Sequence, residues 1–397
     1  MRRLDLLPPT LAEAHARMAA VRTSDYARSR NALDGAVTGL SPYITHGFVD
    51  LPEVAAGVAA NHPLDPQHRL LFELGWREFF RHVWQQHGDA IFTSMHAGTL
   101  PDDAYARELP TDLREARTGV PVIDTAVRTL YATGYLHNHA RMWLASYVVH
   151  LRRVHWRAGA DWLYAHLLDG DLASNHLSWQ WVAGTFSRKP YLFNAGNVAR
   201  YAPARWHSPG SVIDTPYEAL DEIARGGPLP PVRPSGEGVD EPALHRRPPP
   251  AMHALPASGA AVIDHDVWLV HPWTLREPPA DLTAGVLRVS ICTKEFHDRW
   301  AWSDARWAFV GARMRELSTL CWHDSAAAIA TALQSARSVR GVGDAHLDAG
   351  LRAMAGMEAP RQLFAQVEQP CSSFSPWWKQ AHTKDRTEHA TAMETPT

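Results

Sequence analysis

The chain has 397 residues, of which 45% are hydrophobic and 20% charged, and its formal net charge is −3. These values are ordinary for a globular protein, and the length allows two domains, each with its own core. The small net charge argues against a uniformly basic nucleic-acid binder but leaves room for a local basic groove.

The sequence shows no signal for membrane insertion or secretion. No stretch reaches the roughly 18 uninterrupted apolar residues of a membrane span, and the opening MRRLDLLPPT has no apolar core of a signal peptide. Cys292, Cys321 and Cys371 are widely spaced, which argues against a disulfide framework and a four-cysteine iron–sulfur cluster. We therefore expect a cytoplasmic protein without membrane contact.

Residues 1–225 are predicted to form a mostly helical domain. Apolar residues recur at helical spacing in several stretches, and breakers such as Gly119-Val120-Pro121 and Thr133-Gly134 separate them. These stretches are Leu51–Ala60, His68–Gln86, Val122–Tyr131, His137–Val154 and Ala160–Leu168.

The composition changes twice after this domain. Residues 226–259 are dense in Pro and Gly, which predicts an interdomain linker. Over residues 260–382, strands rich in Val, Ile and Leu alternate with helices, a pattern typical of a small parallel α/β domain of the Rossmann type. The polar end, residues 383–397, is expected to be disordered. The expected fold is thus mainly α, with a smaller C-terminal α/β domain.

Tryptophan is unusually frequent, with 16 residues. A large aromatic core is one explanation, and indoles that stack on a ligand or carry electrons are another. The stretch Leu71–His82 bears on the choice, because it places Glu73, Trp76 and Arg77 on one helix face. A carboxylate, an indole and a guanidinium are costly to bury together. The face is therefore either a wall turned toward a ligand or a half-exposed surface with a salt bridge.

A second polar helix face is predicted in Tyr135–Ser146. Asn138, Arg141 and Met142 lie within one turn of each other. His137 and His139 are only two residues apart and point in different directions, and H-E-x-x-H spacing is absent. No metal site is expected here.

The stretch Leu167–Ala183 is the most informative. Asp169 and Asp171 flank a glycine, and Asn175 and two tryptophans follow. A calcium loop is the competing interpretation, but the spaced oxygen ligands and the terminal Glu of an EF-hand are missing. An acidic turn, an amide and two indoles are too polar together for a plain core.

These three stretches, with SPYITHG at 41–47 and TGVPVIDTAVRTL at 118–130, resemble the FAD-binding domain of the DNA photolyase/cryptochrome family. They occur in the family's order and near its spacing over roughly residues 20–205. The resemblance implies that the helical domain binds flavin adenine dinucleotide (FAD). It assigns FAD contacts to Tyr26, Thr38 and Ser41 (phosphates), Arg77 (the bent cofactor), Arg141 and Asp169 (an ion pair beside the isoalloxazine), Asn138, Asp171 (flavin edge and ribose) and Asn175 (flavin N5).

The resemblance also implies a lesion pocket. Trp76 and Trp181 match the indoles that pack against a flipped pyrimidine dimer, and Glu73, Asn138 and Met142 match its other contacts. Relatives acting on the 6-4 photoproduct usually carry a His pair at the last two positions, so a cyclobutane dimer is the expected substrate. Extrusion of the dimer from the duplex is required before such contacts can form.

Electron transfer to the flavin is implied for Trp179 and Trp156, which match the first two members of the family's chain of aromatic residues. Trp179, Trp156, Asn175 and Glu73 are therefore the expected catalytic group. The third member of the chain has no match, and Trp143 and Tyr105 remain as substitutes for it.

The chain departs from the family pattern in several places. Gly39 replaces a common basic residue, and His176-Leu177-Ser178 replaces Asn-Gly-Gly beside the lesion pocket. The segment Val267–Pro278 resembles the opening strand of the family's α/β domain, which begins the relatives. That domain is thus expected to be relocated to the C-terminal end, the alternative being an unrelated small α/β domain. The antenna chromophore stays open, because the G-x-G at Gly341–Gly343 lacks a third glycine.

The function implied is that of a deoxyribodipyrimidine photolyase-like carbon–carbon lyase, which splits cyclobutane dimers in UV-damaged DNA with an electron from photoexcited reduced FAD. The alternative is a cryptochrome-like blue-light photoreceptor that binds a protein partner and repairs nothing; a dark flavin oxidoreductase is a third. The dimer-pocket residues favour repair, and the departures favour the photoreceptor. Basic residues that could track DNA phosphates are Arg152, Arg153, Arg188 and Lys189.

Overall fold

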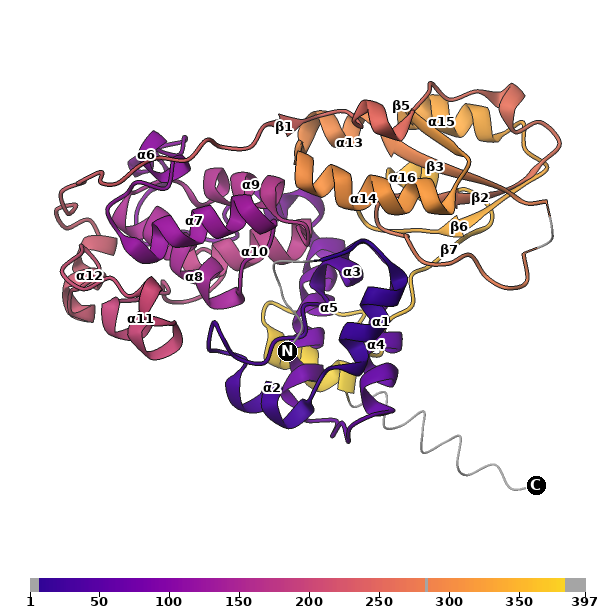
Figure 1. The fold of residues 1–397 in the computed structure, drawn as a ribbon. Coiled ribbons are helices and arrows are strands. Elements are labelled where there is room, and N and C mark those ends of the chain that lie inside the picture. The colour runs from indigo at the N-terminus through magenta and orange to yellow at the C-terminus, as the bar shows by residue number, and fades with distance from the viewer. Residues whose placement is uncertain (1–6, 283–284, 383–397) are drawn as a thin grey trace.

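The computed structural model describes residues 7–282 and 285–382 and shows a helical domain followed by an α/β domain, as the sequence predicts (Figure 1). No helix among these residues is both long enough and apolar enough to cross a membrane. The α-helices of the first domain are α1 (Leu11–Ala19), α2 (Thr23–Ser29), α3 (Ser41–Thr45), α4 (Leu51–Ala59), α5 (Arg69–His87), α6 (Thr111–Arg114), α7 (Pro121–Thr133), α8 (Asn138–Ser146), α9 (Trp156–His166), α10 (Leu172–Ala183), α11 (Ala195–Tyr201) and α12 (Tyr217–Ala224).

Local sequence signals set the helix ends that surround the later site. Helix α7 begins with Pro121 at its first turn and ends at Gly134, whose φ of 64° is left-handed. Helix α10 begins at Asp171, whose carboxylate accepts a hydrogen bond from the Ser174 N–H at 2.9 Å, and it ends at the left-handed Gly184. The predicted helix His137–Val154 is divided, because a π-helical turn at Tyr147–Leu151 follows α8.

The α/β domain contains a parallel sheet of five strands: β2 (Asp266–Val270), β3 (Leu287–Thr293), β5 (Leu320–Asp324), β6 (Ser338–Val342) and β7 (Met357–Glu358). Their order across the sheet is β5-β3-β2-β6-β7, so the third, second, first, fourth and fifth strands of this sheet, counted along the chain, lie side by side. This order is that of doubly wound Rossmann folds and confirms the predicted class. The helices of this domain are α13 (Lys294–Arg299), α14 (Asp304–Leu317), α15 (Ala326–Leu333) and α16 (Ala349–Arg352).

The two faces of the sheet pack against different partners. Along β2, Val267 and Leu269 belong to the cluster that contains Ile329 of α15. Trp268 and Val270 point to the opposite face and belong to the cluster that contains α14. That second cluster continues without a break into α1, α4 and α5 of the helical domain. The length suggested two separate cores, but the largest buried cluster is shared between the two domains.

The predicted linker, residues 226–259, is attached to the surface along much of its length (Figure 1). Glu241 accepts hydrogen bonds from Arg114 at 3.0 Å and from the Trp162 indole at 2.9 Å. Further on, β1 (Leu244–His245) pairs antiparallel with β4 (Trp302–Ser303). The segment therefore joins both domains by specific contacts and is not a free tether.

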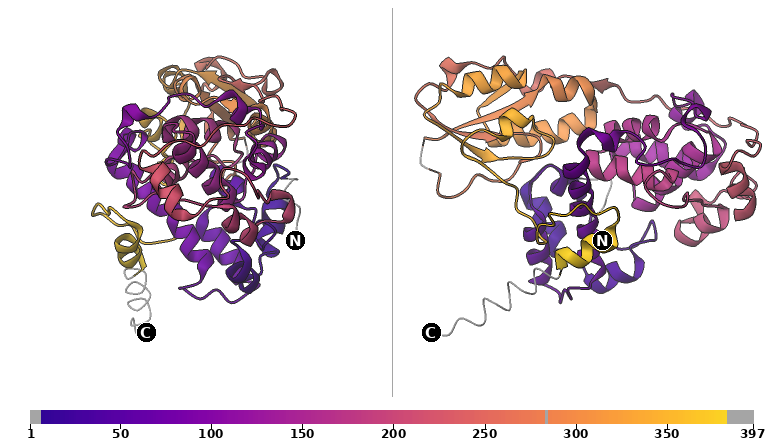
Figure 2. Two further views of the ribbon diagram at one scale, coloured as in Figure 1. Left: turned by 90° about the vertical axis from the view of Figure 1, so that its left-hand side faces the viewer. Right: turned by 180° about the vertical axis from the view of Figure 1, so that it is seen from behind.

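Residues 359–382, named here the C-terminal strap, leave the sheet after β7 and return to α5 (Figures 1 and 2). Phe374 stacks on Trp76 with ring centroids 4.1 Å apart, and a Cβ at Gly75 would lie 2.5 Å from the Trp378 ring. The backbone N–H groups of Leu363 and Phe364 donate to the Glu78 carboxylate at 2.6 and 3.2 Å. The sequence-based boundary at 382 grouped these residues with the sheet, whereas their aromatic side chains pack on α5. The predicted disordered tail, 383–397, lies outside the described residues.

Candidate functional site

A cavity of about 400 Å³ opens between α5, α8, α9 and α10. The structure brings most of the predicted site residues to its wall: Ser41, Glu73, Trp76, Arg77, Asn138, Arg141, Met142, Asp169, Asp171, Asn175, Trp179 and Trp181. It adds Phe80, Ala145, Leu163, Leu167, Ser174, Ser178 and Val182.

Arg141 and Asp169 form the shortest ion pair of the cavity wall among the described residues. One Arg141 nitrogen, Nη2, donates to both carboxylate oxygens at 2.9 and 2.7 Å, and its Nε donates to the Leu136 carbonyl at 2.9 Å. The Asp169 side chain is only 3% exposed. An ion pair whose arginine is also held by a backbone carbonyl keeps one geometry, which a bound ring needs beside it.

Asp171 lies next to it and is held by two other arginines. Its Oδ2 is 3.5 Å from Arg77 Nη2 and 3.3 Å from Arg81 Nη2. Burial alone would raise the pKa of this carboxyl, but Arg77 and Arg81 lower that pKa well below its usual range. Both acids of the predicted acidic turn therefore bind guanidinium groups and do not stand free as ligands for calcium.

The amide and hydroxyl groups of the first turns of α10 supply neutral polar contacts. Asn175 Nδ2 donates to the Ala160 carbonyl at 2.8 Å, which fixes the plane of the amide at the cavity wall. Ser174 also lines the cavity, and its buried hydroxyl has no hydrogen-bond partner among the described residues. A buried hydroxyl without a partner is costly unless a ligand or water satisfies it.

The mouth of the cavity is aromatic on two sides. Trp181 is 37% exposed, and Trp76 is half-buried with Phe374 of the C-terminal strap stacked on its ring. Glu73 accepts a hydrogen bond from Arg30 Nε at 3.3 Å. At the same end of the cavity, Asn138 Nδ2 lies 3.7 Å from the sulfur of Met142. These are the groups for which a lesion pocket was predicted.

Three predicted residues do not belong to the lining of this cavity in the described part of the chain. The Thr38 hydroxyl accepts a hydrogen bond from the Leu40 N–H at 3.2 Å, and burial raises the pKa of Tyr26 on α2. Trp156 is buried at the start of α9, where its indole N–H donates to Ser94 at 3.0 Å. Their phosphate and electron-transfer roles stay predictions.

The aromatic residues around Trp156 bear on the missing electron-transfer member. Trp143 is fully buried and donates to Asn197 at 3.0 Å. Tyr105 is half-buried, and its ring centroid lies 6.1 Å from that of His155, which in turn lies 5.6 Å from that of Trp156. Of the two substitutes, Tyr105 is therefore the one on a path toward solvent.

The predicted phosphate-tracking residues divide into two groups. Arg152 pairs with Asp112 at 2.8 Å, and Arg153 donates to backbone carbonyls, so both are used inside the fold. Arg188 and Lys189 are exposed, shortly after Trp181 in the chain. The prediction that basic residues track DNA phosphates is therefore left with this second pair, which lies beside Trp181 in the structure.

The chemistry of the cavity fits FAD. Its volume lies within the roughly 300–1,000 Å³ of small-molecule sites. It offers aromatic and aliphatic walls for a flat ring and the two arginines Arg77 and Arg141 near an anionic ligand, together with the unpaired Ser174 hydroxyl. Polar groups fixed by Asp169 and Asp171 are the kind by which a protein tunes a bound flavin.

Sequence reasoning missed several residues around this cavity. Arg77 donates to the Thr45 hydroxyl at 2.8 Å, and Arg81 joins Asp171 to Asp344. Arg81 could have been found, because it lies one helical turn after Arg77 on the same face. Asp344 could not, since no local pattern connects a loop of the α/β domain with α5.

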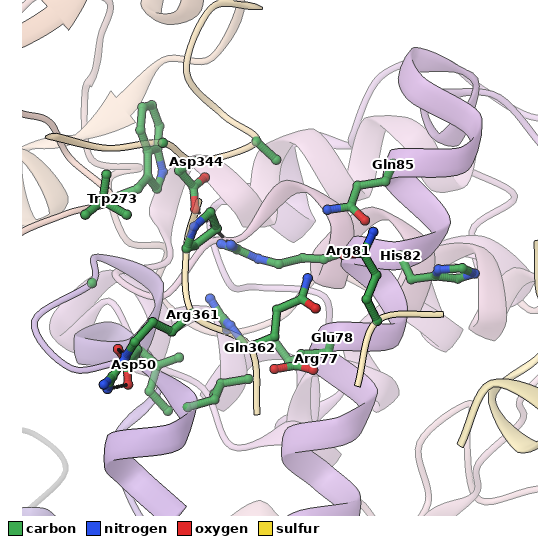
Figure 3. Close-up of a pocket in the computed structure, with 18 of the residues that line it drawn as sticks. Asp50, Arg77, Glu78, Arg81, His82, Gln85, Trp273, Asp344, Arg361 and Gln362 are labelled. Atoms are coloured by element: carbon green, nitrogen blue, oxygen red, sulfur yellow. Dashed lines mark hydrogen bonds and ion pairs between the residues drawn. The ribbon is translucent and has the colours of Figure 1, made fainter. Parts of the chain in front are cut away.

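A second cavity, of about 150 Å³, lies at the carboxyl ends of the paired strands β2 and β6, where the strand order reverses, between the sheet, α5 and the C-terminal strap (Figure 3). Its wall includes Trp273, Asp344 and Glu78. The carboxyl ends of the strands at such a reversal are the usual ligand position in open α/β sheets. The α/β domain is thus docked with this edge toward the helical domain.

The family described as the FAD binding domain of DNA photolyase matches residues 70–209. Over 198 residues the chain is 31% identical to a deoxyribodipyrimidine photo-lyase of Synechococcus sp., covering 45% of this chain and 39% of that protein. It is 33% identical over 165 residues to the deoxyribodipyrimidine photo-lyase of Escherichia coli (37% and 35% covered). It is 36% identical over 124 residues to a cryptochrome DASH of Gloeobacter violaceus (30% and 24% covered).

Two solved structures that are similar to part of this chain are those of a cryptochrome and a photolyase. A Synechocystis cryptochrome matches with a TM-score of 0.39 and 28% identity, covering 48% of this chain and 43% of that one. An archaeal photolyase from Sulfolobus tokodaii, solved with two FAD molecules, matches with a TM-score of 0.43 and 25% identity, covering 56% and 53%. The chain spans less than half the length of the curated relatives it matches. Residues 70–209 of the helical domain thus match the FAD binding domain of DNA photolyase, and this domain is the part of the chain that is similar to photolyases and cryptochromes.

Proposed function

We propose that the chain is a light-driven DNA repair flavoprotein that splits cyclobutane pyrimidine dimers. One observation carries the proposal: a single cavity has the flavin-side groups Arg141, Asp169 and Asn175 on its wall and the indoles Trp76 and Trp181 at its mouth. A protein that only senses light does not need two indoles set to receive a base.

The residues at the mouth would hold an extruded dimer. An exposed indole and a half-buried one offer flat faces to a lesion that has left the base stack, and such stacking is worth roughly 1–3 kcal/mol per base. Glu73 and Asn138 supply polar contacts, and Met142 supplies an adaptable apolar one. Bound FAD would supply an electron after absorbing light and take it back after the ring has opened. The protein's part is orientation, exclusion of water and short distance.

The aromatic residues behind the cavity would restore the reduced flavin. Trp179 lies in the cavity wall and packs closely against α9. The contact is so close that a Cβ added at Gly159 of this helix would lie only 2.3 Å from the Trp179 ring. Trp156 lies one turn before that glycine, and Tyr105 approaches it through His155. We propose the order Tyr105, Trp156, Trp179 for electrons moving inward.

The alternative function, a cryptochrome-like photoreceptor, has one observation in its favour. Phe374 of the C-terminal strap stacks on Trp76 at 4.1 Å with an interplanar angle of 9°, so one face of that indole is already occupied. A strap held on the pocket wall could pass a change in the cavity to a protein partner. The curated relatives include both photolyases and cryptochromes DASH, which leaves both functions within the family.

The test is repair of an oligonucleotide that contains one thymine dimer, with FAD-loaded, reduced protein under blue light and in the dark. We expect light-dependent restoration of the thymines, and a roughly 5- to 150-fold weaker binding of the dimer oligonucleotide by Trp181→Ala, the equivalent of a lost stacking contact. FAD content should not change in this variant, because Trp181 stands at the mouth. Wild-type protein that binds FAD and photoreduces without repairing the dimer would make the photoreceptor the better account.

A further inference from the structure

Three segments of the α/β domain reach the acidic turn of the FAD cavity. Arg306 of α14 donates to the carbonyls of Tyr164 at 3.0 Å and of Gly170 at 2.6 Å. The loop after β6 contributes Asp344 and His346. The loop after β2 acts through His46, whose Nδ1 lies 2.6 Å from the Pro272 carbonyl and whose Nε2 lies 2.8 Å from the carbonyl of Leu168, just before the turn. Gly170, between Asp169 and Asp171, is thus held by a hydrogen bond from Arg306, more than a hundred positions away in the chain.

Arg81 connects the FAD cavity with the α/β domain directly. Its Nη2 lies 3.3 Å from Asp171 Oδ2, and its Nη1 lies 2.8 Å from Asp344 Oδ2. Figure 3 shows Arg81 extending from α5 to Asp344 beneath Trp273. Asp171 and Asp344 are 1% and 5% exposed, so this chain of charges is protected from solvent. Such protected pairs act over short distances with little screening.

His346 completes the connection. Its Nδ1 lies 2.6 Å from Asp344 Oδ1, and its Nε2 accepts a hydrogen bond from the Leu172 N–H at 3.3 Å, in the first turn of α10. The ring is fully buried, stacked on Trp273 with centroids 4.9 Å apart and met edge-on by Trp84 at the same distance. Because Nε2 accepts, Nδ1 carries the proton and donates to Asp344. Two rings and two hydrogen bonds leave the imidazole one orientation.

We propose that Asp344 and His346 of the α/β domain are positioning residues of the FAD site, which fix the Asp171 carboxylate through Arg81 and through the first turn of α10. They do not line the FAD cavity in the described structure, and the one direct approach to its wall is that of His346 Nε2, 4.0 Å from Asp171 Oδ2. The α/β domain is therefore a structural part of the FAD site.

The charges give the proposal an electronic consequence. Arg77 and Arg81 oppose Asp171 and Asp344, so the four buried charges sum to zero. Asp344→Asn removes one negative charge and leaves an excess positive charge next to the cavity. A positive field favours addition of an electron to a ligand bound there. Asp344→Asn also removes one of the two carboxylates bound by Arg81, so Arg81 can pull Asp171 away from its position.

The test uses the full chain in the dark and without DNA, so its result does not depend on whether the protein repairs dimers. We expect Asp344→Asn to weaken FAD binding roughly 2- to 30-fold, measured by flavin fluorescence titration, the range of coupling typical for connected residues. The midpoint reduction potential of bound FAD should become more positive. Asp344→Glu, which keeps the charge, should hold the potential near that of the wild type.

Arg276→Gln is the matched control, because Arg276 pairs with Asp50 at 2.8 Å across the same two domains but touches no residue of the acidic turn. It should leave both FAD affinity and potential unchanged. Folded Asp344→Asn with wild-type affinity and potential would overturn the proposal, and so would an equal change in Arg276→Gln. If Asp344→Asn does not fold, the FAD affinity of His346→Gln decides instead. This variant keeps a hydrogen-bond acceptor for the Leu172 N–H but loses the bond to Asp344. An unchanged FAD affinity in this variant would overturn the proposal.

Discussion

Asp169→Asn is expected to lower the affinity for FAD by roughly 100-fold and the free energy of unfolding by about 3 kcal/mol. The variant keeps the shape of the side chain but leaves Arg141 without the carboxylate that accepts its two hydrogen bonds at 2.9 and 2.7 Å. A guanidinium whose partner is lost inside the fold is strongly unfavourable, and it is no longer fixed beside the ligand. FAD content after reconstitution and fluorescence titration measure the first effect, and urea unfolding the second.

A matched control separates stability from binding. Arg152 and Asp112 form another bidentate pair in the same domain, at 2.8 and 2.9 Å, with side chains 10% and 11% exposed. Asp112→Asn should lower stability by a similar amount and leave FAD affinity unchanged in the folded protein. If Asp169→Asn binds FAD as well as Asp112→Asn does, FAD lies elsewhere.

The C-terminal strap should make stability depend on pH through Glu78. Burial raises the pKa of this carboxyl from 4.5 to about 7, although the N–H groups of Leu363 and Phe364 lower it. A carboxyl group whose pKa is higher in the folded than in the unfolded protein contributes fully to stability at a pH below its pKa in the unfolded protein. This contribution is lost as the pH rises through its pKa in the folded protein. Between pH 4.5 and about 7, Glu78 should therefore cost about 3 kcal/mol of unfolding free energy.

Glu78→Gln should remove this dependence. Its unfolding free energy relative to the wild type should increase from pH 4.5 to pH 8 by about 3 kcal/mol, as measured by urea unfolding at several pH values. Glu218→Gln, at an exposed position of α12, is the control and should give a nearly constant difference. A constant difference for Glu78→Gln as well would show that Glu78 ionises normally beneath the strap.

Short-range patterns were enough to predict the helical domain and the face that the cavity uses. The spacing of Glu73, Trp76 and Arg77 placed them on one side of α5, where they lie. Prolines and left-handed glycines such as Gly134 marked helix ends, because few residues tolerate those backbone angles.

Features that depend on distant partners could not be predicted. Strand β5 has only five residues, and its place in the sheet depends on pairing with β3, about 30 positions earlier in the chain. The C-terminal strap packs on α5 through Phe374 and Trp378, about 300 positions from their partners in the chain. The pairing of Arg81 with Asp344 is set by how the two domains dock, and no local pattern records docking.

The measurement that tests the central claim most directly is the fluorescence lifetime of the full chain loaded with reduced FAD, with and without bound oligonucleotide. If the cavity holds FAD behind the indoles Trp76 and Trp181, a bound thymine dimer lies within short electron-transfer range. The lifetime should then shorten with the dimer oligonucleotide and stay unchanged with the same undamaged sequence. An unchanged lifetime with the dimer demonstrably bound would contradict electron transfer to the lesion, and with it the repair function.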